Sequence, residues 1–245
     1  MHKKIVHIIK MIVVLTSILF LGFIPFTLRV LSFGMLTSFN RKYLAPVICK
    51  FTLFLIGMRI EIHLPEKLPH PAFITFNHNS ILDAFGLMAM GLSKTRFLMT
   101  ELILYQMPFG NFMAWGVGCL FIPPKSSRER RIAFLKNCVV RIKKESCSIA
   151  GSSEGVHRHE HGICRFNRGV YHMALAAEVP VVALYIHLPE MNNPFNDYRA
   201  FESGTMHITH LDTFQTAHWK LNSLDEHIEV VRNAYIEEFK KRNQS

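Results

Sequence analysis

The sequence predicts an α/β protein, a mixed sheet flanked by helices, with an N-terminal membrane-associated helical segment before it. Two observations carry this prediction. An uncharged apolar stretch at residues 11–28 follows a basic start, and beyond Gly57 short β-like runs alternate with amphipathic helical runs. The predicted division is a membrane-anchoring helical segment at residues 1–56 and an α/β domain at residues 57–245. A chain of 245 residues can bury a full core, so one domain plus an anchor accounts for its length.

The N-terminal segment carries the clearest signal of location. Residues 11–28 are long enough to cross the hydrocarbon core at about 1.5 Å per residue. Pro25 and Arg29 stand where a signal peptide would need a small-residue cleavage site. A second apolar stretch, residues 44–58, is short and is interrupted by Lys50. A single crossing and a helical hairpin that enters one leaflet both fit, so the prediction is membrane attachment.

Charge and cysteine content narrow the partners and the compartment. A formal net charge of +10 combined with 49% hydrophobic residues fits an anionic membrane surface better than nucleic acid. No nucleic-acid-binding motif is present, so no nucleic-acid partner is expected. The five cysteines are scattered, odd in number and form no CxxC pair, which predicts reduced packing residues in a domain that faces the cytoplasm.

Alternation and bounded apolar runs predict the strands of the α/β domain. The expected strands are residues 59–64, 72–77, 96–99, 117–122, 147–151, 179–186 and 206–211. A helix is expected up to Met90, and a second one over residues 127–144, where Ser126 and Glu129 form a predicted capping box. A final helix is expected after Ser223. Two apolar stripes predict which faces are buried: Ile132, Leu135, Val139 and Ile142 on the second helix, and Leu224, Ile228, Val231, Tyr235 and Phe239 on the last.

The most informative short segment is residues 77–83. His78 and Asp83 are five positions apart, just past a predicted strand and at the start of a predicted helix. There the carboxylate can hold the imidazole in one tautomer while the other ring nitrogen takes a proton. A half-buried histidine beside a first-turn helix aspartate would leave the same pattern, so the context has to decide. Ser80 could be a covalent nucleophile, but small polar residues are common at helix starts.

Four ordered blocks resemble the motifs of the lysophospholipid acyltransferases related to 1-acylglycerol-3-phosphate acyltransferase, which have a PlsC-like domain. Asn77, His78 and Asp83 match the family's Asn-His-x4-Asp. Residues 118–124 are similar to Gly-x-x-Phe-Ile-Asp-Arg, residues 152–157 to Phe-Pro-Glu-Gly-Thr-Arg, and residues 166–169 to Phe-Lys-x-Gly. Residues 179–182 are similar to the fourth motif, and the resemblance covers residues 57–211 in the family's order.

The resemblance implies an O-acyltransferase of phospholipid biosynthesis. It would move a fatty acyl group from acyl-CoA or acyl carrier protein to the hydroxyl of a lysolipid such as 1-acylglycerol-3-phosphate. His78 would be the general base and Asp83 its orienting partner, and backbone N–H groups at the start of the following helix are expected to steady the oxyanion. The expected partners are membrane lipid, the lysolipid and the acyl donor; no cofactor and no metal are expected. The catalytic domain is expected to face the cytoplasm from the membrane.

The substrate-binding residues follow from the same motifs and from departures from them. Glu154 and Gly155 are expected to shape the acceptor pocket, and Asn77 to belong to the substrate site. The family's phosphate-associated arginines are replaced by Pro124 and His157. Nearby basic residues are expected to take their place, because arginine offers a phosphate bidentate contacts. These are Lys125, Arg128, Arg158 and Arg168.

Three alternatives stay open. The acceptor could lack a phosphate, as in a lyso-amino-acid lipid. The chain could be a repurposed member of the family that binds lipid with weak or no catalysis. Alternating histidines in an extended segment can also surround Zn²⁺, so His157, His159 and His161 allow a metal-dependent hydrolase, although acyl transfer needs no metal.

Overall fold

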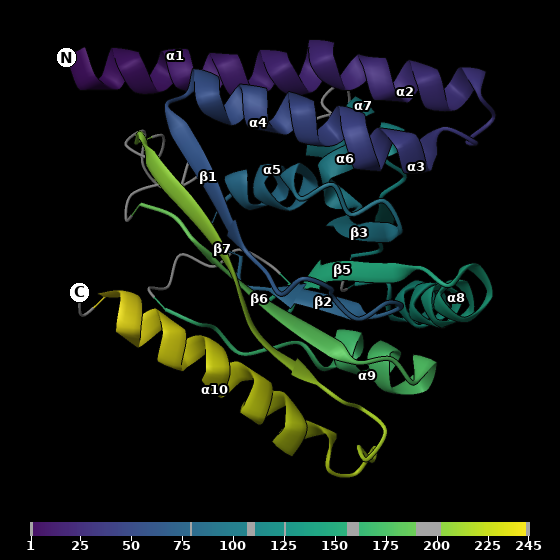
Figure 1. Ribbon diagram of the computed structural model, residues 1–245. Coiled ribbons are helices and arrows are strands. Elements are labelled where there is room, and N and C mark those ends of the chain that lie inside the picture. Colours follow the sequence, from purple (N-terminus) through teal and green to yellow (C-terminus); the bar gives the residue numbers. More distant parts are fainter. Residues whose placement is uncertain are drawn as a thin grey trace.

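The computed structural model describes residues 2–78, 80–106, 111–124, 126–155, 162–189 and 202–243 (Figure 1). The described residues form α-helices, two π-helical turns and β-strands. The helices are α1 (His2–Thr16), the π-helical turn η1 (Ser17–Leu21), α2 (Gly22–Leu31), α3 (Thr37–Phe39), the π-helical turn η2 (Asn40–Leu44), α4 (Ala45–Leu55), α5 (Leu82–Ala89), α6 (Leu102–Gln106), α7 (Phe112–Gly116), α8 (Arg128–Glu145), α9 (Arg168–Ala177) and α10 (Leu224–Asn243). The strands are β1 (Met58–His63), β2 (Phe73–Phe76), β3 (Thr95–Thr100), β4 (Leu120–Ile122), β5 (Ser148–Ser152), β6 (Val181–His187) and β7 (Gly204–Phe214).

The strands of the described residues form one mixed sheet in the order β1-β7-β6-β2-β5-β3-β4. β7 is antiparallel to β6 and parallel to β1, and the other neighbouring pairs are parallel. The central strands β2, β5 and β6 are buried along nearly their whole length, as expected for parallel strands with helices on both faces. The predicted fold class, a mixed sheet flanked by helices, is confirmed.

Two hydrophobic cores lie on opposite faces of this sheet. On β2, Ile74 and Phe76 belong to the core shared with α4 and α5, while Phe73 belongs to the core shared with α8, α9 and α10. Figure 1 shows the resulting layers, with the N-terminal helices and α5 above the sheet and α9 and α10 below it. The carboxyl ends of β2, β5 and β6 meet at one edge, and the loops that follow them are therefore brought together.

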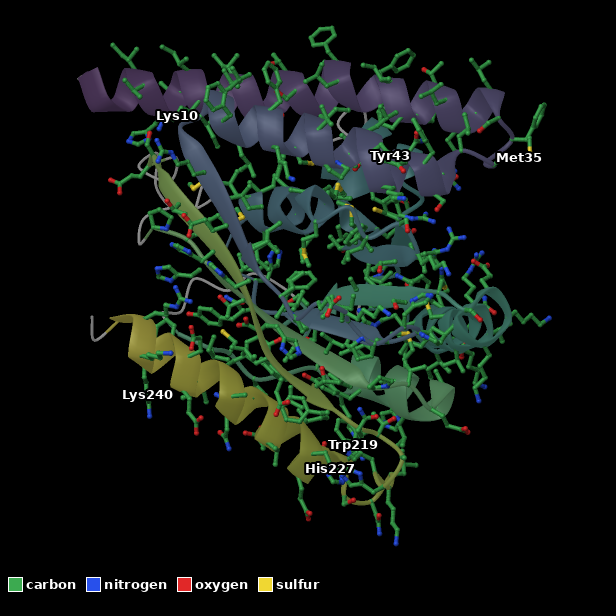
Figure 2. The ribbon with its side chains drawn as sticks, viewed as in Figure 1. Lys10, Met35, Tyr43, Trp219, His227 and Lys240 are labelled. Atoms are coloured by element: carbon green, nitrogen blue, oxygen red, sulfur yellow. The ribbon has the colours of Figure 1, made fainter. Side chains whose placement is uncertain are left out.

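The N-terminal helices form a layer whose outer face is apolar. α1, η1 and α2 make one long rod, and its residues Ile5–Leu31 are long and apolar enough to cross a membrane, by length and composition. η1 ends at Leu21. Pro25 has no backbone N–H to donate to the Leu21 carbonyl, which explains why the helix widens to a π-helical turn here. Figure 2 shows side chains that project from the outer face of the rod. The large apolar side chains that are exposed on the rod and on α4 include Ile8, Ile9, Ile12, Phe20, Phe23, Ile24, Leu31, Val47, Phe51 and Phe54.

The helical layer is packed tightly against the α/β domain through α7. A Cβ atom added at Gly116 would lie 2.6 Å from the backbone of Pro25 and Phe26, so α2 and α7 touch backbone to backbone. Asn40 Nδ2 donates to the carbonyls of Pro25 and Gly116, at 2.8 Å and 3.0 Å. The predicted boundary at Gly57 coincides with the junction of α4 and β1, although helices before it share a hydrophobic core with the sheet. The division into two parts stays a prediction.

Several local expectations differ from the structure. α8 begins after Ser127, which makes no side-chain capping bond, so the capping box at Ser126 is wrong. Ile132 is exposed, because the face of α8 that packs on the core is the one that carries Cys138 and Ile142. β4 is shorter than expected, since Gly118 adopts a left-handed conformation just before it. None of the five cysteines forms a disulfide bond and all five are buried, as expected for packing residues.

Candidate active site

The histidine and the aspartate of the first motif are in contact at the carboxyl end of β2. Asp83 Oδ2 lies 3.0 Å from His78 Nδ1, and the His78 side chain is 31% exposed whereas that of Asp83 is 0% exposed. β2 ends at Phe76 and α5 begins at Leu82, so the contact bridges the turn from strand to helix, as the spacing predicts. When Nδ1 carries the proton and donates to the carboxylate, Nε2 is left as an acceptor.

The turn after His78 is built to hold the Asp83 carboxylate. The Ser80 N–H donates to Asp83 Oδ2 at 2.9 Å, and the Leu82 N–H donates to Ser80 Oγ at 3.2 Å. The Asp83 N–H donates to the Ser80 carbonyl at 3.2 Å. These three N–H groups are therefore engaged within the turn, and stabilisation of the oxyanion by N–H groups at the helix start stays a prediction. Ser80 is buried with its hydroxyl engaged in the turn, which argues against a nucleophile.

Asn77 fixes the strand end that carries His78. It is completely buried, and its side-chain amide forms two hydrogen bonds with the backbone of one residue of the neighbouring strand β6. Asn77 Nδ2 donates to the Ile186 carbonyl at 2.8 Å, and the Ile186 N–H donates to Asn77 Oδ1 at 2.7 Å. With both amide atoms engaged, Asn77 acts as a positioning residue. Its predicted contact with substrate stays a prediction.

Glu154 brings the third motif against the first. This buried carboxylate accepts the His78 N–H on Oε1 at 3.1 Å and the Cys164 N–H on Oε2 at 3.0 Å. It therefore joins the loop after β5 to the loop after β2, next to the histidine ring. The Glu154 side chain thus positions His78 and contributes negative charge to its surroundings.

These negative charges set the proton affinity of His78. Burial by itself would lower its pKa. The hydrogen bond that the ring donates to Asp83, the charge of Asp83 and the charge of Glu154 together outweigh burial and hold the pKa of His78 above the ordinary value of 6.5. A histidine with a raised pKa binds a proton more tightly, which suits a group that removes a proton from a weakly acidic hydroxyl.

Comparison with known families identifies the domain. The sequence model of the Acyltransferase family matches residues 59–187, from β1 to the end of β6. This range is more than half of the chain and contains His78, Asp83 and Glu154. The chain belongs to the acyltransferase family.

Relatives and a solved structure agree with this assignment. Human 1-acyl-sn-glycerol-3-phosphate acyltransferase beta is 26% identical over 167 residues, covering 67% of this chain and 59% of its own length. The alpha enzyme of Bos taurus is 23% identical over 197 residues, covering 77% of this chain and 65% of its own length. The chain thus spans about three fifths of these relatives. The crystal structure of the 1-acyl-sn-glycerophosphate (LPA) acyltransferase PlsC from Thermotoga maritima has the same fold, with a TM-score of 0.66 at 16% identity over 91% of this chain and 96% of that one.

The basic residues predicted for this acyltransferase are only partly described. Lys125 and Arg158 lie outside the described residues, as do His157, His159 and His161 of the possible metal cluster. Arg128 is exposed at the first residue of α8. Arg168 donates to Asp225 Oδ2 and to the Leu221 carbonyl, both at 3.0 Å, so its guanidinium is held beside the start of α10. Binding of a phosphate by these residues stays a prediction.

The loop of the third motif depends on two residues that sequence reasoning used little, Ser153 and Asn167. Ser153 stands where the family has proline, and its buried hydroxyl contacts Thr75 Oγ1 and lies 2.6 Å from Tyr171 OH. Asn167 Nδ2 donates to the carbonyls of Ser153 and Glu154. The serine at position 153, in place of the family's proline, is therefore explained by the buried hydrogen bonds that its hydroxyl makes. For Asn167, the only signal in the sequence is that an asparagine stands where the family's Phe-Lys-x-Gly motif has lysine.

Gly155 is required by the same loop, and its replacement tests how strongly the loop supports the site. Its φ is +75°, and a Cβ atom would lie 2.3 Å from Asn167 Nδ2, which is itself fixed by two carbonyls. We expect Gly155→Ala to lower the free energy of unfolding by about 1–3 kcal/mol, measured by denaturant unfolding. Gly169→Ala in α9, where φ is not left-handed, is the matched control and should change stability less. Equal losses in the two variants would contradict the argument.

Proposed function

We propose that this acyltransferase moves a fatty acyl group from the thioester of acyl-CoA or acyl carrier protein to the hydroxyl of a lysolipid such as 1-acylglycerol-3-phosphate. The observation that carries the proposal is the 3.0 Å contact of His78 Nδ1 with the buried Asp83 carboxylate. The contact lies at the carboxyl edge of the sheet, within the range that matches the family. No bound cofactor takes part, and the acyl donor is a co-substrate.

The chemistry assigned to His78 is general base catalysis. Nε2 accepts the proton of the acceptor hydroxyl while the hydroxyl oxygen attacks the thioester carbonyl. This attack forms the new C–O bond and a tetrahedral oxyanion, whose collapse restores the carbonyl and breaks the C–S bond. The departing sulfur takes the proton from the imidazolium, so His78 ends the cycle neutral and no acyl-enzyme forms. Asp83 holds the ring and stabilises the imidazolium between the two proton transfers.

The packing of the helical layer supports a proposed placement at the membrane surface. A helix that crosses a bilayer alone is surrounded by lipid, whereas the Ile5–Leu31 rod packs one face on α4 and α7 and exposes the other. We infer that the apolar outer faces of the rod and of α4 enter one leaflet, with the α/β domain on the cytoplasmic side. Five cysteines without disulfide bonds fit a reducing compartment. The first motif belongs to the sheet face that carries the helical layer, so a lysolipid can reach it from the membrane.

The experiment that tests the function uses membranes carrying the full chain. Radiolabelled acyl groups are offered as acyl-CoA and as acyl carrier protein to a panel of lysolipids with and without a phosphate, including a lyso-amino-acid lipid. We expect a labelled diacyl product, and the panel names its head group. Label transfer only to acceptors without phosphate would favour the alternative acceptor class. Absence of product with every pair, from folded protein, would favour a member of the family that binds lipid without catalysis.

A further inference from the structure

A second cluster of reactive side chains lies away from His78, at the outer edge of the sheet. Glu61 and His207 are register partners on the parallel strands β1 and β7, and His63 follows Glu61 by two residues on the same face of β1. Figure 1 shows these two strands side by side, descending from the helical layer. The cluster faces away from the core that holds Ile60 and Ile208, since those residues alternate with it.

The donor atoms of this cluster are spaced as metal ligands are. Glu61 Oε2 lies 3.7 Å from His63 Nε2 and 3.2 Å from His207 Nδ1, and the ligand atoms all lie within 4.8 Å of one another. Two donors that each bind Zn²⁺ at about 2.1 Å in a tetrahedron are roughly 3.4 Å apart. Two of the three separations are therefore close to this value, and the third is at most 4.8 Å.

The surroundings leave room for an ion and its water. The side chains of Glu61 and His63 are 54% and 58% exposed, and that of His207 is 27% exposed. His187, the register partner of His207 on β6, has its ring centroid 6.2 Å from that of His207 and is a third imidazole close to the cluster. Arg242 on α10 donates to Thr209 Oγ1 on β7 at 3.2 Å and to Glu238 Oε1 at 2.7 Å, so a carboxylate compensates its charge.

We propose that Glu61, His63 and His207 bind a divalent transition metal ion of the Zn²⁺ type, with water completing the coordination. Two imidazoles and one carboxylate are a donor set that Zn²⁺ takes in proteins. The ion would link β1, the edge strand that leaves the helical layer, to β7. The same joint is held by the Gly204 N–H on the Gly57 carbonyl at 3.0 Å and by Lys10 Nζ on Ser203 Oγ at 2.8 Å. The proposal is independent of acyl transfer.

The test is zinc binding by the purified full chain in detergent after treatment with a chelator. We expect one Zn²⁺ per chain by calorimetry and, at a hundredfold excess over Kd, a rise in Tm of roughly 5–10 °C. His63→Ala and His207→Ala should each weaken binding at least tenfold and remove most of the rise. His63 is largely exposed, so its variant should keep the Tm of the metal-free wild type and decides the matter if His207→Ala does not fold.

Two control variants separate this cluster from the other histidines. His218 and His227 have ring centroids 5.5 Å apart, and Figure 2 places His227 at the other end of α10 from Lys240. The double variant His218→Ala/His227→Ala and the triple variant of His157, His159 and His161 to Ala should both keep the tight site. Zinc binding that survives loss of His63 and His207 together, that disappears with the triple variant, or that is absent from the wild type would overturn the proposal.

Discussion

Replacing His78 by Ala should lower the rate of acyl transfer by about 10²–10⁴-fold, the usual contribution of a positioned general base. The ring is the only part of the site that the proposal asks to move a proton, and its Nδ1 is held by Asp83 at 3.0 Å. His78→Gln should lose as much, because an amide cannot take the proton. Binding of lysolipid should persist in both variants, since the backbone N–H of residue 78 that contacts Glu154 remains.

The matched control for His78→Ala is His218→Ala. His218 is exposed and far along the chain from the first motif, so its loss should leave kcat and KM within twofold of the wild type. Turnover unchanged in His78→Ala, with the product panel otherwise intact, would remove His78 from the mechanism. Loss of lipid binding together with turnover would instead indicate that the ring supports the shape of the site.

Replacing Asp83 by Asn should also reduce kcat by about 10²–10⁴-fold while the KM for the acyl donor changes little. The variant keeps the size of the side chain but removes the charge that stabilises the imidazolium. An amide in this position can also donate to Nδ1, which would place the ring proton on Nε2, the nitrogen that must accept. Asp83 acts through His78, so it is a positioning residue in this account.

Asp212→Asn is the control for this change, because Asp212 is an exposed aspartate on β7. It should leave turnover as in the wild type. An unfolding measurement on Asp83→Asn is needed beside the kinetics, since the buried carboxylate also accepts the Ser80 N–H at 2.9 Å. A folded Asp83→Asn protein with full kcat would show that the ring needs no carboxylate.

The fold and the pair of catalytic candidates follow from local patterns. β2 and the start of α5 lie where the apolar run at residues 72–77 and the segment through Met90 predict them, and the five-residue spacing of His78 and Asp83 is bridged within one turn. Successive side chains of a strand point to opposite faces of the sheet, so the residues of β2 alternate between the two hydrophobic cores. Such features depend on neighbours in the chain, which a sequence displays directly.

The supporting contacts could not be predicted in the same way. Asn77 pairs with Ile186, 109 positions away, and Glu154 pairs with the N–H of His78, 76 positions away. Their residue types suggested a substrate site, but only the sheet order shows that neighbouring strands occupy their polar atoms. The cluster of Glu61, His63 and His207 could not be predicted either, because β1 and β7 are distant in sequence and adjacent in space.

The pH dependence of kcat/KM tests the central claim most directly, because it reports the proton affinity of the base in the free enzyme. His78 must be neutral to act, so the rate should rise with pH through its pKa. That pKa is raised, so the half-maximal point should lie above 6.5 in the wild type. Asp83→Asn removes the main interactions that raise the pKa of His78, whereas burial still lowers this pKa. The rise of kcat/KM with pH should therefore occur at lower pH in this variant, with a reduced maximum. A rise that stays at the same pH when Asp83 is replaced would contradict the assignment of His78 as the base.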